Sequence, residues 1–68
     1  MGVRVRQGER YITAERRAGR VEIYRDPLDF RWHEFLGYAG WDGVKLTNVP
    51  KQITEATIAE LESQLRGG

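Results

Sequence analysis

The sequence has no cysteine and only one histidine, His33, and these two shortages exclude several kinds of site. Without cysteine the chain cannot form a disulfide framework, a thiolate nucleophile or a cysteine metal site. A single histidine is also too few for the common zinc-ligand sets. We therefore expect a protein that holds no metal and no cofactor.

Long apolar runs are missing as well. No stretch of the chain approaches the roughly 18 apolar residues that a membrane span needs. The first ten residues contain no apolar segment of the kind found in signal peptides. These features predict a cytoplasmic protein that does not bind membranes.

The length and composition predict one small folded domain covering residues 1–68. Hydrophobic residues make up 40% of the chain and the formal net charge is only +1, which is not the composition of a disordered segment. A chain of this size buries only about 60% of its unfolded surface, and no disulfide or metal adds stability. We therefore expect part of the aromatic surface to be covered by a partner or by a second copy in a homodimer.

The first 25 residues have the pattern of a three-stranded antiparallel meander. Apolar and polar side chains alternate in the first and third segments, and residues 11–14 are strand formers. A two-residue turn at Gln7-Gly8 would join the first two strands, and a three-residue loop ending at Gly19 would join the second pair.

Residues 27–36 can be interpreted in two ways. A helix could begin with Asp26 as its cap and Pro27 at its first position. Its apolar stripe would consist of Leu28, Trp32, Phe35 and Leu36. The alternative is a third hairpin that turns at Pro27 and Leu28. Because the helix leaves only Phe30 off its stripe, we expect a central helix.

The rest of the chain predicts a short strand and a second helix. The glycine-rich residues 38–43 read as a connection, and residues 44–47 alternate as a strand. Thr54 is a good helix cap, and Gly67 can end the helix. The apolar stripe of this helix would be Ile58, Leu61 and Leu65. The predicted fold is therefore α+β, with a meander, a central helix, a short strand and a C-terminal amphipathic helix.

Positive charge is concentrated in the predicted meander. Residues 1–25 hold seven arginines and three glutamates, a net charge of +4. Guanidinium groups on an exposed ribbon can reach phosphates or base edges, although an acidic protein surface would suit them equally. The same arginines could also simply form the solvated face of a sheet. The candidate nucleic-acid-binding residues are Arg4, Arg6, Arg16, Arg17 and Arg20.

Two aromatic residues in the predicted connection are candidates for protein contact. Trp41 has glycines close by on both sides, and Tyr38 lies three residues before it. A large ring on a loop can anchor a partner, but it can equally close a small core as a lid.

The sequence gives little support for catalysis. His33 lies four residues after Asp29, so a helix would bring the two together, but no nucleophile accompanies them. We expect a structural role for this pair and no enzymatic activity.

The leading functional prediction is a small binding module that contacts DNA through an arginine-rich hairpin, an arrangement similar in outline to small three-strand-plus-helix DNA-binding domains. The alternative is an inhibitor or adaptor module that uses Trp41 and the apolar helix face.

Overall fold

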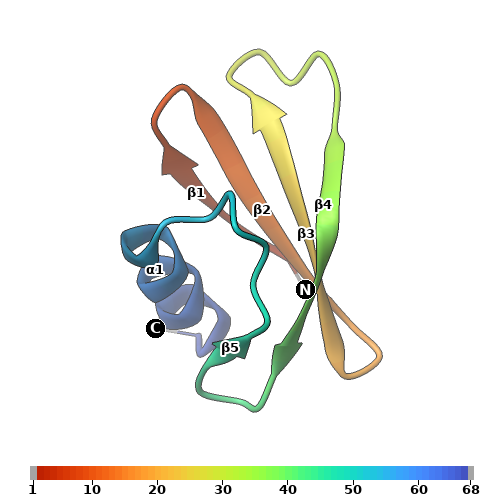
Figure 1. Ribbon diagram of the computed structural model, residues 1–68, viewed down its shortest axis with the longest axis vertical. Helices are drawn as coiled ribbons and strands as arrows, with labels where there is room; N and C mark the ends of the chain where they lie inside the picture. The colour runs from red at the N-terminus through yellow and green to blue at the C-terminus, as the bar shows by residue number, and fades with distance from the viewer. Residues whose placement is uncertain (1, 68) are drawn as a thin grey trace.

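The computed structural model describes residues 2–67, which form a five-stranded antiparallel sheet and one helix (Figure 1). Met1 and Gly68 lie outside the described residues. The elements are β1 (Gly2–Gln7), β2 (Arg10–Arg17), β3 (Arg20–Pro27), β4 (Glu34–Trp41), β5 (Leu46–Thr47) and α1 (Glu55–Leu65). The strands lie in the sheet in their sequence order. An antiparallel sheet followed by a separate helix confirms the α+β class.

The predicted meander is confirmed as β1, β2 and β3, but its turns differ from the prediction. Gln7 pairs with Arg10, so the first turn is Gly8 and Glu9 rather than Gln7 and Gly8. The second turn also has only two residues, Ala18 and Gly19, and both have positive φ angles, of 48° and 80°. Two such residues form a type I′ turn, whose twist matches that of the flanking strands.

The predicted central helix is wrong. Residues 28–33 form a loop, and the chain then returns as β4 along the free edge of β3. A third hairpin therefore forms, as in the alternative interpretation, but its turn is this loop rather than Pro27 and Leu28. This pairing satisfies the backbone groups of β3 that a helix would have left open. Asp26 is therefore a strand residue and not a helix cap.

A bulge in β4 decides which way its side chains point. The register shifts between Ile23 and Tyr24 of β3, so that Ile23 pairs with Gly37 and Tyr24 with Phe35. Leu36 is the extra residue, and it packs against the core together with the buried Ala39. Phe35 and Tyr38 point to the other side of the sheet, and their side chains are about half exposed.

The expected connection at residues 38–43 is also wrong, because β4 continues to Trp41. β5 is correspondingly shorter than the predicted strand. Gly40 allows this pairing, since a Cβ atom there would lie 2.4 Å from the side-chain oxygen of Thr47. Asp42 shapes the turn that follows, with its Oδ1 accepting hydrogen bonds from the backbone of Val44 (2.8 Å) and Lys45 (2.7 Å).

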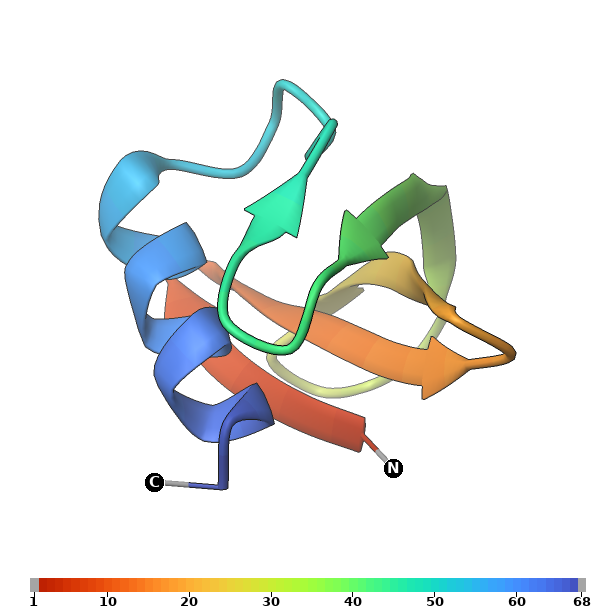
Figure 2. The same ribbon diagram turned by 90° about the horizontal axis from the view of Figure 1, so that it is seen from below.

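Helix α1 packs against one side of the curled sheet, alongside β1 (Figure 2). Thr54 caps it as predicted, and Gly67 follows its last turn with a φ of 85°. The core between helix and sheet contains Val5, Ile12, Ala14, Val21, Ile23, Ala39, Leu46, Ile53, Leu61 and Leu65. No helix in residues 2–67 has the length and apolar character needed to cross a membrane.

The Gln7 side chain holds the start of α1 to the end of β1. Its Nε2 donates to the Gln52 carbonyl (2.9 Å), and its Oε1 accepts from the backbone N–H of Thr54 (3.0 Å). At the other side of the helix, Glu62 Oε2 accepts from the backbone N–H of Leu46 (2.8 Å). These bonds join the helix to both edges of the sheet.

Candidate functional site

The sheet face turned away from α1 holds aromatic, arginine and acidic side chains that contact one another, and we call it the outer face. Successive strand residues point to opposite sides, so the residues between the core positions share this face. Two residues of the loop before β4, Phe30 and His33, fold onto it. The strand residues of the outer face are Arg4, Arg6, Tyr11, Thr13, Glu15, Arg17, Arg20, Glu22, Tyr24, Asp26, Phe35 and Tyr38.

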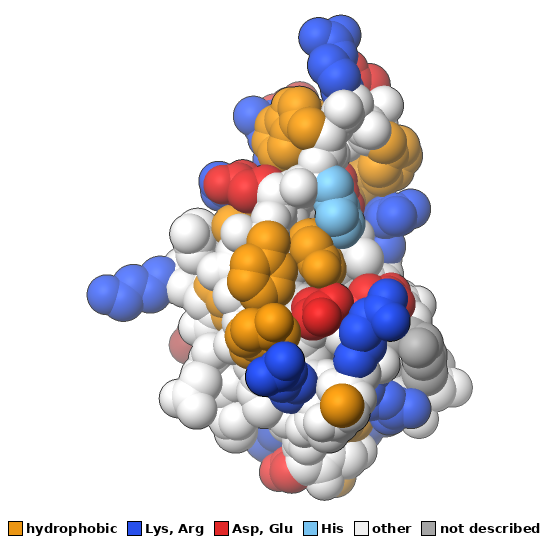
Figure 3. Space-filling model, turned by 90° about the vertical axis from the view of Figure 1, so that its right-hand side faces the viewer, with side chains coloured by type: hydrophobic (Ala, Val, Ile, Leu, Met, Phe, Trp, Pro, Cys, Tyr) orange, Lys and Arg blue, Asp and Glu red, His pale blue; other side chains and the backbone are white. Residues whose placement is uncertain are grey.

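Aromatic rings on the outer face form two groups. In the first, Phe30 stacks on Tyr11 with ring centroids 5.2 Å apart. In the second, Tyr24 lies 5.4 Å from Phe35, which meets Tyr38 nearly edge-on at 5.1 Å. The exposed fractions of Phe30, Phe35 and Tyr38 are 50%, 47% and 47%. Figure 3 shows hydrophobic side chains gathered around the single histidine, with Lys and Arg side chains nearby.

Arginine side chains lie over several of these rings. The guanidinium carbon of Arg4 is 4.6 Å from the Phe30 ring centroid, and that of Arg20 is 4.0 Å from Tyr38. At the start of β2, on the side opposite to Tyr11, Arg10 is 5.9 Å from the Trp32 ring. Within residues 2–67, these three arginines form no ion pair with a carboxylate. The outer face thus combines exposed rings with positive charge that no local acid neutralises.

The backbone of Phe30 is strained. Its φ angle is 54°, in the left-handed region, and its N–H donates to the Pro27 carbonyl at 3.1 Å. A residue with a Cβ atom held in such a conformation costs on the order of 1–3 kcal/mol. The stacking of the ring on Tyr11 offsets part of this cost, while half of the side chain remains exposed. Strain that serves to present an apolar ring to solvent is typical of a functional position.

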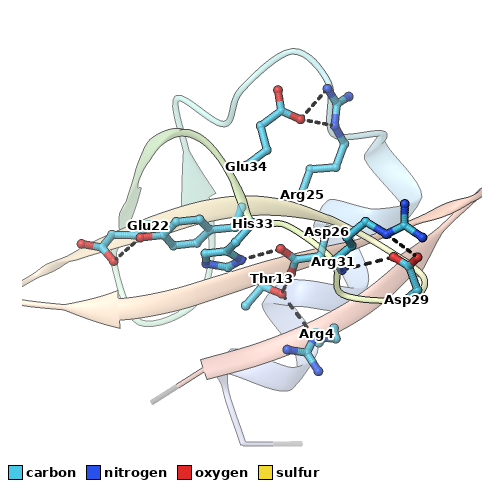
Figure 4. A network of polar contacts seen from close by, with 10 residues as sticks. Arg4, Thr13, Glu22, Arg25, Asp26, Asp29, Arg31, His33 and Glu34 are labelled. Atoms are coloured by element: carbon cyan, nitrogen blue, oxygen red, sulfur yellow. Dashed lines mark hydrogen bonds and ion pairs between the residues drawn. The ribbon is translucent and has the colours of Figure 1, made fainter.

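A chain of polar contacts runs across the outer face (Figure 4). Asp26 is only 2% exposed, and its Oδ2 accepts a hydrogen bond from Thr13 Oγ1 at 2.9 Å. Its Oδ1 contacts His33 Nδ1, and Arg4 Nε donates to Thr13 Oγ1 at 3.3 Å. The predicted pairing of His33 with Asp29 is therefore wrong, because the loop replaces the helix. Asp29 instead forms an ion pair with Arg31 at 3.3 Å.

The hydroxyl of Tyr24 belongs to a second polar group at the same face. It donates to Glu22 Oε1 at 3.0 Å, and this hydrogen bond, with burial as the second cause, raises the pKa of Tyr24 above its ordinary value. Arg17 forms ion pairs with Glu22 (3.3 Å) and Glu15 (3.7 Å). The charge of Arg17 is thus largely balanced by its neighbours.

The structure separates the residues that the sequence singled out for binding. Arg4, Arg6, Arg17 and Arg20 lie on the outer face, whereas Arg16 pairs with Val21 on the core side of the ribbon. The predicted hairpin tip therefore does not present its three arginines together.

The two aromatic candidates also lie on opposite sides of the sheet. Tyr38 lies on the outer face, half exposed. Trp41 packs against the core, where its Nε1 is buried without a hydrogen-bond partner.

Sequence reasoning missed five aromatic residues of the face. The signal that could have found them is alternation, because in a sheet the positions that alternate with the core residues must share the opposite face. For β2 and β3 this rule points to Tyr11 and Tyr24 directly. The missed residues are Tyr11, Tyr24, Phe30, His33 and Phe35.

Residues 2–67 bring together no group of three or more acidic or histidine side chains that could hold a metal ion. Comparison of the chain with family models, with curated proteins and with solved structures gave no match, so the interpretation of the outer face depends on its geometry.

Proposed function

We propose that this protein is a non-enzymatic binding module for single-stranded nucleic acid and that the outer face of the sheet is its contact surface. The observation that supports this function is the combination on one open sheet face of half-exposed rings and arginines without acidic partners. Proteins that bind single strands use this combination, with rings that stack on bases and cations that follow the phosphates.

The exposed rings favour an unpaired strand over a duplex. A ring can stack on a base only when the face of that base is free, whereas the bases of a duplex are stacked on one another. Phe35 and Tyr38 offer neighbouring positions for bases, and Phe30 offers another across the sheet. Arg4 and Arg20 lie over the rings of Phe30 and Tyr38, and they would turn toward the phosphates when bases stack there.

This proposal moves the contact surface away from the tip of the second hairpin. Arg20 remains in it, together with Arg4 and Arg6 of β1. Arg17 contributes less because Glu15 and Glu22 balance its charge.

Binding can be measured by fluorescence anisotropy with a labelled 15-nucleotide single strand and a duplex of the same sequence. We expect the single strand to bind more tightly, with affinity falling steeply as salt rises, because neutralised phosphates release counterions. Phe35→Ala should weaken binding by about 5- to 150-fold, which corresponds to the ~1–3 kcal/mol of one base–ring stack. Val44→Ala is the control, since Val44 is a similarly exposed apolar residue in the turn before β5.

Tighter binding to the duplex, salt-independent binding, or equal effects of the two substitutions would contradict the proposal. The same experiment also addresses the protein-interaction alternative. Half-exposed Phe30, Trp32, Phe35 and Tyr38 would suit a protein partner or a second copy as well. In that case the protein would not bind the labelled nucleic acid. Self-association measured by sedimentation, or capture of a protein partner, would persist after nuclease treatment.

A further inference from the structure

We propose that His33 makes the outer face select RNA over DNA, because its Nε2 is held ready to accept a hydrogen bond from a ribose 2′-hydroxyl. This inference rests on the proposed function, since it names the class of strand that the same face binds. It follows from the direction of the hydrogen bonds around Asp26 and from the position of the imidazole ring.

The polar chain that ends at His33 has a fixed direction. Arg4 can only donate, so the Thr13 hydroxyl must accept from it and give its own proton to Asp26. Asp26 lies within reach of two groups that can donate, the Thr13 hydroxyl and the His33 imidazole, and a carboxylate would accept from both. In the arrangement that we propose, the proton between Asp26 and His33 resides on Nδ1 of the imidazole. In the neutral ring, Nε2 is then left as an acceptor with a free lone pair.

The position of the ring is fixed as well. One edge contacts Asp26, and one face stacks on Tyr24 with centroids 3.9 Å apart and an angle of 16° between the planes. The side chain nevertheless remains 54% exposed. Because one edge and one face of the imidazole are already held, the side chain loses little conformational entropy when a ligand binds to Nε2.

The neighbouring rings decide what meets this nitrogen. Tyr24 contacts both His33 and Phe35, with its centroid 3.9 Å from the first and 5.4 Å from the second. A base stacked on Phe35 would place its sugar beside the histidine. The backbone of DNA has no hydrogen-bond donor, whereas each ribose of RNA carries a 2′-hydroxyl that can donate. The acceptor at His33 would therefore distinguish the two polymers.

The test compares three strands with the same base: oligouridylate, oligodeoxyuridylate and 2′-O-methyl oligouridylate. We expect oligouridylate to bind about two- to tenfold more tightly than the other two, the range of one net hydrogen bond. The methylated strand keeps the ribose oxygen but loses its donor, so its weaker binding would identify the donor as the cause. Equal dissociation constants for oligouridylate and oligodeoxyuridylate would overturn the inference.

A second comparison uses variants of the histidine. His33→Phe keeps a ring that can stack on Tyr24 but removes the acceptor, so the ratio of affinity for oligouridylate to affinity for oligodeoxyuridylate should fall to about one. His33→Gln restores a side-chain acceptor and should recover part of the preference. Persistence of the full preference in His33→Phe would contradict the proposed role.

The tautomer can be read directly from the imidazole ¹⁵N shifts of the free protein at neutral pH. We expect a protonated Nδ1 and an unprotonated Nε2, and the opposite tautomer would refute the argument. This inference and the proposed function fail in different ways. If no strand binds, the proposed function is wrong, whereas if RNA and DNA bind equally well, only the role of His33 is wrong.

Discussion

The two hydrogen bonds of Gln7 give the sharpest prediction about stability. This side chain bridges the end of β1 and the start of α1. It bonds to the backbone of Gln52 and Thr54, which lie 45 and 47 residues further along the chain. Gln7→Met keeps the length and approximate volume of the side chain but removes both the donor and the acceptor. The substitution should therefore loosen the junction of helix and sheet without opening a cavity.

The magnitude follows from the two bonds. A typical neutral hydrogen bond contributes ~0.5–1.5 kcal/mol net, so two bonds contribute about 1–3 kcal/mol. Because Gln7 is only half-buried, water can replace part of this loss, and we expect about 1–2 kcal/mol. For a domain of this size, each 1 kcal/mol lowers the melting temperature by about 4–8 °C, which gives a decrease of about 4–16 °C.

Thermal unfolding followed by circular dichroism measures this change, and Gln52→Met is the matched control. Gln52 is exposed and contributes only its backbone carbonyl to the junction, so its side chain can be replaced without breaking either bond. Hydrogen exchange should in addition show faster exchange of the Thr54 amide in Gln7→Met. Equal melting temperatures for the two variants would refute the reasoning that these bonds hold the helix start.

Three further predictions concern a turn and two ionisable groups. Ala18→Asn should stabilise the protein by about 1 kcal/mol, because Asn tolerates the positive φ of the first turn position better than Ala, and a chemical denaturation curve with an unchanged midpoint would contradict this. In a spectrophotometric titration, Tyr24 should ionise above its ordinary pKa of 10. Glu22→Gln should lower the pKa of Tyr24, because it removes the carboxylate that accepts the hydrogen bond of the Tyr24 hydroxyl. An unchanged pKa in the variant would exclude Glu22 as the cause. The backbone N–H groups of the turn lower the pKa of Asp42, so the stability that its charge contributes is present above the unfolded pKa and is lost as the pH falls through the lower folded value. Asp42→Asn should therefore lose less stability than the original protein between pH 5 and pH 2, and parallel unfolding curves over that range would count against this assignment.

The sequence by itself determined the elements whose local signals agreed with one another. In β1 and β3, apolar and polar side chains alternate along the sequence, and the structure buries the apolar Val5, Val21 and Ile23 on one side of the sheet. At the C-terminal helix, the cap at Thr54 and the stripe of Leu61 and Leu65 gave consistent signals. These features depend on neighbours in the chain, so a local pattern is sufficient to predict them.

The tertiary structure alone decided the segment from Pro27 to Trp41. Its apolar spacing fits a helix, but the open edge of β3 offers a full row of backbone hydrogen bonds, and a pattern read along the chain does not include that edge. The bulge beside Ile23 then set which rings of β4 face solvent.

The candidate site has the same origin. His33 meets Asp26 because a loop folds back over β3, and Phe30 reaches Tyr11 across the sheet by adopting a strained backbone. The sequence predicted that arginines would lie on the strands of the meander, since alternation along a strand is a local property. Which ring lies beside which cation depended on the register between strands, and that register is fixed only when the whole sheet is assembled.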